Sequence, residues 1–122
     1  MEEQKITFET AKLAFEKKFN WETDMGFTMS GKLEPPYYGN KFKNGDYNNS
    51  VLFSAPTQAL LQKWLRDIHK MYISIDIEDK NQFMYYVLDF SDNNEYIQRE
   101  SIYPTYEEAL ESALVHALTL IK

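Results

Sequence analysis

The sequence contains no cysteine, and glycine and proline are scarce, with four of each among 122 residues. Without cysteine the chain can form neither a disulfide framework nor a thiolate metal site. Its length is typical of one domain, and a chain of this size can bury a core without covalent cross-links. We therefore expect a single domain over residues 1–122, with a helix and a long loop in residues 1–50 and an α-β-β-β-α core in residues 51–122.

Long apolar runs are also missing. The longest uncharged stretch near the C-terminus, residues 112–121, is about half of the roughly 20 apolar residues that a membrane-spanning helix needs. Residues 1–4 are acidic and lack the basic and apolar regions of a signal peptide. These features predict a cytoplasmic protein with no membrane partner.

Positive charge is scarce in one half of the chain. Residues 71–122 carry three Lys/Arg and ten Asp/Glu, whereas residues 1–70 carry ten and nine, which gives the net charge of −6. A surface so poor in cations repels a phosphate backbone. The C-terminal half is therefore a poor candidate for nucleic-acid binding and a better one for binding a basic protein.

Three segments have apolar residues at helical spacing. The first follows an N-cap at Thr7 and should end near Asn20, with a stripe formed by Phe8, Ala11, Phe15 and Phe19. The second starts around residues 54–57, with Pro56 in its first turn, and its predicted buried face is Leu60, Leu61, Trp64, Leu65 and Ile68. The third starts at the capping box Thr105–Glu108, and its predicted buried face is Leu110, Ala113, Leu114, Ala117, Leu118 and Ile121.

Between the last two helices the pattern changes to the period of two that is typical of strands. Residues 71–78 and 83–90 predict a hairpin around the polar turn 79–82, and residues 96–101 a third strand. If Glu78 pairs with Phe83, Ile75 lies opposite Tyr86 and the strongly apolar side chains share one face. Short strands near residues 27–33 and 51–53 would flank a long loop. The whole pattern predicts an α+β fold: an antiparallel sheet of three or more strands with three helices, whose C-terminal half runs helix-strand-strand-(strand)-helix.

Groups that could support catalysis are few. Only two histidines occur: His69 closes the second helix, and His116 should be exposed on the third. Neither has a partner three or four residues away with which to bind a metal. A divalent ion held by Asp76, Glu78 and Asp89 is an alternative to a solvated sheet face, and the solvated face is the simpler interpretation. The sequence therefore predicts no catalytic, cofactor or metal site, and a protein that is not an enzyme.

Two surfaces remain as candidates for binding. The first is the sheet face that the predicted register turns outward, where aromatic and acidic side chains mix; its candidate partner-binding residues are Tyr72, Asp76, Glu78, Phe83, Tyr85 and Asp89. The second is a loop in which aromatic residues alternate with cations, as in surfaces that bind single-stranded nucleic acid; its residues are Tyr37, Tyr38, Lys41, Phe42, Lys43 and Tyr47. Packing of these aromatics against the core is the alternative in both places.

Residues 54–69, Ser-Ala-Pro-Thr-Gln-Ala-Leu-Leu-Gln-Lys-Trp-Leu-Arg-Asp-Ile-His, resemble a motif of small uncharacterised proteins of phages, prophages and other mobile elements of gut anaerobic bacteria. The segments 106–111 and 117–121 are similar to the ends of the same proteins. The resemblance covers mainly residues 51–122. It implies a phage or prophage setting in a bacterial host cell, and it brings no substrate or catalytic residue with it. Together with the charge pattern, it favours a non-enzymatic accessory protein that binds a protein partner or itself; a nucleic-acid-associated protein that uses the loop 37–47 is the alternative.

Overall fold

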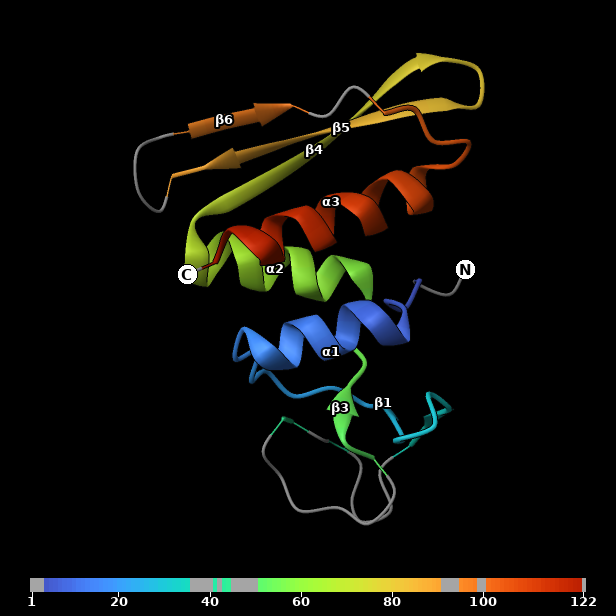
Figure 1. Ribbon diagram of the computed structural model, residues 1–122, viewed down its shortest axis with the longest axis vertical. Coiled ribbons are helices and arrows are strands. Elements are labelled where there is room, and N and C mark those ends of the chain that lie inside the picture. The colour runs from blue at the N-terminus through green and yellow to red at the C-terminus, as the bar shows by residue number, and fades with distance from the viewer. Residues whose placement is uncertain are drawn as a thin grey trace. The chain divides into compact units, whose positions relative to one another are not determined.

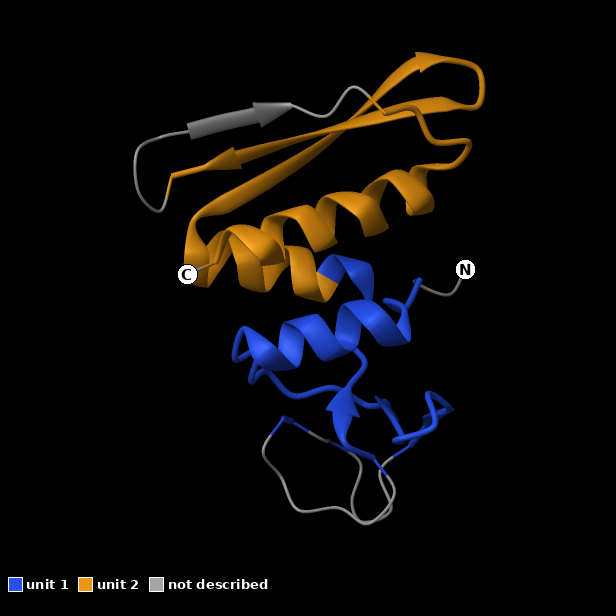
Figure 2. Cartoon of the chain, viewed as in Figure 1, with its two compact units in different colours: residues 1–59 blue, residues 60–122 orange. Residues whose placement is uncertain are grey.

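The computed structural model describes residues 4–35, 41, 43–44, 51–90, 95–98 and 101–121. Helices and antiparallel strands are both present, so the predicted α+β class is confirmed (Figure 1). The chain divides into two compact units, Met1–Ala59 and Leu60–Lys122 (Figure 2). The expectation of a single domain stays a prediction.

The first unit combines one helix with a small three-stranded sheet. Helix α1 spans Phe8–Glu16, and the Thr7 hydroxyl accepts a hydrogen bond from the Thr10 amide at 3.3 Å, which confirms the predicted N-cap. The helix ends earlier than predicted because Lys18 adopts a left-handed conformation with φ of 71°. Of the predicted stripe, Ala11 and Phe19 are buried, but Phe15 is exposed.

The small sheet has the strand order β2-β1-β3, formed by β1 (Gly26–Phe27), β2 (Leu33–Glu34) and β3 (Phe53–Ser54). Its central strand contains Gly26 at a point where the chain has no room for a side chain. A Cβ atom on Gly26 would lie 2.5 Å from Cγ1 of Val51 and 3.0 Å from the Phe53 carbonyl oxygen. This glycine therefore lets β1 and residues 51–53 approach each other closely.

Helix α2 spans Gln58–His69 and begins two residues after Pro56. Leu61, Trp64 and Leu65 are buried as predicted, whereas Ile68 is exposed, so its assignment to the buried face was wrong. Lys70 follows with a left-handed φ of 57°, which ends the helix and starts the next strand.

The second unit contains a sheet of strand order β4-β5-β6, formed by β4 (Met71–Asp79), β5 (Gln82–Asp89) and β6 (Glu95–Gln98). Three predicted strands are thus confirmed, but the predicted hairpin register is wrong. Ile75 pairs with Tyr85 instead of Tyr86, and Asp76 pairs with Met84. The pairing Asp79–Gln82 at the turn agrees with the prediction, but the next pair is Ile77–Phe83, so Glu78 is an extra residue that forms a β-bulge. This bulge shifts the register of all the pairs that follow.

Helix α3, Tyr106–Leu120, packs along one face of β4 and β5 (Figure 1). The predicted N-cap is confirmed, because the Glu108 amide donates to the Thr105 hydroxyl at 3.1 Å. The Thr105 hydroxyl in turn donates to the Glu108 carboxylate at 3.1 Å. All six residues of the predicted buried face are buried. Within the described residues, no helix has the length and apolar character required to span a membrane.

Candidate partner-binding surface

Two strands form a sheet face that α3 does not cover. The residues Met71, Ile73, Ile75 and Ile77 of β4 lie on the same side of the sheet as their partners on β5, and α3 packs on that side. Because side chains alternate along a strand, the residues between them lie on the opposite side. That outer face carries Tyr72, Ser74 and Asp76 from β4, and Met84, Tyr86 and Leu88 from β5.

The outer face is hollowed. A depression of about 350 Å³ is lined by Tyr72, Ile73, Ser74, Asp76, Tyr86 and Leu88. Its lining thus combines two tyrosines and two aliphatic residues with one serine and one aspartate. No lysine, arginine or histidine takes part in this lining.

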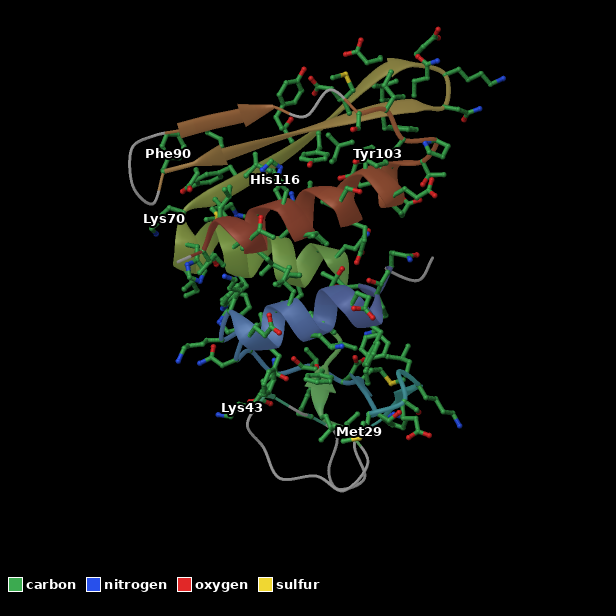
Figure 3. All side chains as sticks on the ribbon, viewed as in Figure 1. Met29, Lys43, Lys70, Phe90, Tyr103 and His116 are labelled. Atoms are coloured by element: carbon green, nitrogen blue, oxygen red, sulfur yellow. The ribbon has the colours of Figure 1, made fainter. Side chains whose placement is uncertain are left out.

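An aromatic pair lies at one end of this face. The rings of Tyr72 and Phe90 meet edge to face, with centroids 5.6 Å apart and planes at 73°. Both stay partly accessible, at 41% and 44% exposure, and Figure 3 labels Phe90 at the end of β5. Ile77, at the other end of β4, is 70% exposed. The strand pair thus presents apolar surface that its own unit leaves in contact with solvent.

The structure separates the six residues that were predicted to form this surface. Tyr72, Asp76 and Glu78 are exposed, Glu78 at the bulge. Tyr85 and Asp89 were placed outward wrongly, because the shifted register turns them toward α3, where they are 3% and 7% exposed. Phe83 lies on the same side and is half-buried. The prediction missed Tyr86 and Leu88, which only the bulge brings outward.

The inner face explains why Tyr85 can be buried. Its hydroxyl group lies 3.0 Å from Nδ1 of His116, which points from α3 toward the sheet (Figure 3). The prediction that His116 is exposed was therefore wrong, and the histidine is half-buried. Since the ring of Tyr103 also packs against Tyr85, at 6.2 Å, the hydroxyl and the imidazole sit within a packed layer.

His69, the last residue of α2, is half-buried. The His69 ring packs edge to face against Trp64 at 4.7 Å. Burial lowers the pKa of His69 below its ordinary value of 6.5, and the charge of Asp89 opposes this by raising it. The lowered pKa favours the neutral imidazole, which weakens the role of helix-terminal cation that the position of His69 suggested.

The carboxylates do not gather into a metal site. Asp76 lies on the outer face and Asp89 on the inner one. The alternative that Asp76, Glu78 and Asp89 hold a divalent ion together is therefore wrong. Within the ranges that the structure describes, no three His, Asp or Glu side chains come together where they could hold a metal.

The structure describes the alternative surface in the loop 37–47 only in part. Lys41 and Lys43 are exposed, and Figure 3 labels Lys43. The four aromatics of that prediction, Tyr37, Tyr38, Phe42 and Tyr47, lie outside the described residues.

Comparisons with known proteins give no further guide to the role of either surface. No protein-family model, no curated protein and no solved structure matches the chain.

Proposed function

We propose that this protein is a non-enzymatic binding protein that holds a basic protein partner on the outer face of β4 and β5. The observation that carries this proposal is the hollow lined by Tyr72, Tyr86 and Leu88 with the Asp76 carboxylate beside them. Tyrosine combines a large apolar contact area with a polar hydroxyl, and it is enriched where proteins bind each other.

The charge around the hollow favours a cationic partner. Residues 71–122 carry ten Asp/Glu and three Lys/Arg, and no cation takes part in the lining. An acidic surface attracts a basic partner over about one Debye length, roughly 8–10 Å at physiological ionic strength, and so speeds its association. The same field disfavours DNA and RNA.

The exposed apolar groups support the same proposal. Tyr72 and Phe90 lie at one end of the outer face, and both have large exposed fractions. Apolar patches rimmed by polar residues are typical of protein-binding sites. The resemblance of residues 54–69 to proteins of phages and mobile elements supports a setting in the cytoplasm of a bacterial host, where the partner would be a host or phage protein.

Charge reversal tests the proposal without touching the core. The double variant Asp76→Lys with Glu78→Lys changes two exposed carboxylates at the hollow and the bulge. The control is Glu16→Lys with Glu22→Lys, which makes the same change of net charge at exposed positions in the first unit. We expect proteins captured from induced bacterial cells to be lost with the first variant and retained with the control. Retention of every captured protein by both variants would show that this face is not the binding surface.

A further inference from the structure

The outer edge of β4 presents unpaired backbone groups in a fixed direction. The Phe90 amide donates to the Lys70 carbonyl at 2.9 Å, in the register that pairs Tyr72 with Leu88. Backbone groups of an antiparallel strand point alternately toward and away from the neighbour. The even-numbered residues of β4 therefore bond to β5, and Ile73, Ile75 and Ile77 point their amides and carbonyls to the other side.

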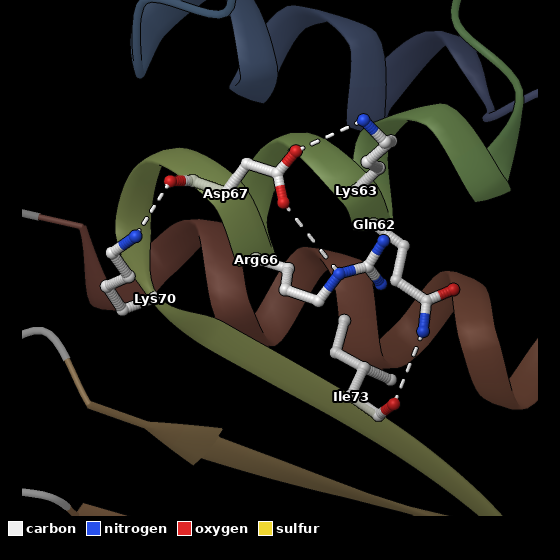
Figure 4. Close-up of polar contacts among 6 residues, drawn as sticks. All are labelled: Gln62, Lys63, Arg66, Asp67, Lys70 and Ile73. Atoms are coloured by element: carbon white, nitrogen blue, oxygen red, sulfur yellow. Dashed lines mark hydrogen bonds and ion pairs between the residues drawn. The ribbon is translucent and has the colours of Figure 1, made fainter.

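A side-chain contact confirms this direction. The Gln62 side-chain amide donates to the Ile73 carbonyl at 3.2 Å, from α2 (Figure 4). Helix α2 thus satisfies the first outward carbonyl of the strand. Beyond it, no described residue hydrogen-bonds to the outward backbone of Ile75 or Ile77, and the sheet order β4-β5-β6 leaves β4 at the edge.

Open edges usually carry features that prevent another strand from adding to them, and β4 has two: the bulge at Glu78 and the acidic side chains Asp76, Glu78 and Asp79. The acidic side chains disfavour the addition of an acidic strand and favour a basic one. A second copy paired antiparallel around Ile75 would bring its own Asp76 to about 7–8 Å from the first, on the same face. A strand with lysine or arginine at the facing positions would instead pair opposite charges.

We propose that the β4 edge binds an extended, basic segment of a protein partner as an additional strand. Its alternate side chains would be lysine or arginine next to Asp76 on the outer face, and apolar next to Ile75 and Ile77 on the other. Strand addition of this kind takes its affinity from backbone hydrogen bonds and its specificity from alternate side chains. The inference deepens the proposed function and rests on it, because it names the segment that the acidic face would bind and the edge along which it lies.

Two peptides and one pair of variants test the inference. The probes are a short peptide in which lysine alternates with valine, and the same peptide with glutamate for each lysine. We expect the lysine peptide to bind at least about tenfold more tightly at low salt. It should also slow amide hydrogen exchange at Ile75 and Ile77, measured by NMR, whereas amides that already bond to β5, such as that of Ser74, should change little.

Two variants distinguish the contribution of the Ile75 backbone N–H to peptide binding from that of its side chain. Ile75→Pro and Ile75→Ala both truncate the side chain, but only proline removes the outward N–H, and proline is tolerated on an edge when that N–H faces solvent. We expect the proline variant to bind the lysine peptide at least about tenfold more weakly than the alanine variant. Circular dichroism checks the fold, and if the proline variant does not fold, hydrogen exchange in the unaltered protein decides.

Failure of this inference can be distinguished from failure of the proposed function. Tyr86→Ser changes the hollow and leaves the β4 edge intact. Suppose that Tyr86→Ser abolishes peptide binding, and that the peptide either leaves the Ile75 and Ile77 amides of the unaltered protein unprotected or binds the Ile75→Pro and Ile75→Ala variants equally. In either case the outer face binds the partner, and strand addition is wrong. If neither peptide binds, strand addition is wrong, and the loss or retention of captured proteins by the charge-reversal variant decides the proposed function separately. Equal affinity for the two peptides would overturn the basic character of the partner.

Discussion

The hydroxyl group of Tyr85 and Nδ1 of His116 lie 3.0 Å apart, and they join β5 to α3 across 31 positions of the chain. Their rings meet nearly at right angles, at 82°, with centroids 5.8 Å apart. A half-buried imidazole thus offers a partner to a tyrosine hydroxyl that would otherwise lose its hydration on burial, and the pair stabilises one of the two possible orientations of β5.

This contact should be measurable as a coupling energy. Removing the hydroxyl with Tyr85→Phe and the imidazole with His116→Leu should each destabilise the fold, and the double variant should cost less than the sum by about 0.5–1.5 kcal/mol, the usual net value of a buried hydrogen bond. Urea unfolding of the four proteins completes the cycle. Additivity within about 0.3 kcal/mol would show that the two groups do not interact.

Trp64 is expected to be the most sensitive single position of α2. Its side chain is almost fully buried, as are the side chains of Leu61 and Leu65 on the same helix. Truncation by Trp64→Ala should lower the free energy of unfolding by about 3–5 kcal/mol, a large part of the stability of a small protein. Ile68→Ala, at an exposed site on the same helix, serves as the control and should cost about 0.5 kcal/mol or less. A Trp64→Ala protein as stable as the control would contradict the burial seen here.

Gly26 should tolerate no side chain. Gly26→Ala places a methyl group against Cγ1 of Val51 and the backbone of Phe53, so we expect a loss of about 1–3 kcal/mol from overpacking. Combining it with Val51→Ala removes part of the clash, and the double variant should be more stable than the sum of the single effects predicts. Strict additivity, measured by thermal or urea unfolding, would place the strain elsewhere.

His69 should make the stability depend on pH. Because burial lowers its pKa in the folded state below 6.5, the unfolded chain takes up a proton at a higher pH than the folded protein does. The free energy of unfolding is therefore unaffected by this group well above pH 6.5, and it falls as the pH drops below that value, until the folded state is protonated as well. Urea midpoints measured across this range should fall less steeply for His69→Gln than for the unaltered protein. Parallel curves would rule out His69 as the cause.

The sequence-based predictions were accurate where the pattern is local and inaccurate where it depends on contacts in the folded protein. Helix α3 was predicted closely, since its cap is a local motif and its buried residues share one face. The alternation of β4 and β5 was also visible, because strand patterns are local. Their register was not, since it depends on the bulge at Glu78 and on polar groups that find partners only in the folded state.

The candidate surface shows the same limit. Counting apolar residues alone favours the register that buries Tyr86 and Leu88 and exposes Tyr85 and Asp89. The structure takes the other register, in which His116 meets Tyr85 and Asp89 lies near enough to affect the pKa of His69. Asp76 remained outward because the alternation of β4 is unbroken up to Ile77, and Glu78 is exposed as the bulge residue itself.

The extra residue at the bulge has a consequence for how this hairpin can change in length. Without Glu78, Ile77 would connect directly to Asp79, and the pairs Asp79–Gln82 and Ile77–Phe83 would follow each other in an unbroken ladder. A deletion of Glu78 should therefore leave every remaining pair in place, whereas a deletion of Ser74 would shift the strand on one side of the gap by one residue and turn its side chains to the wrong face. Natural variants that lack one codon in this strand are expected to have lost it at the bulge.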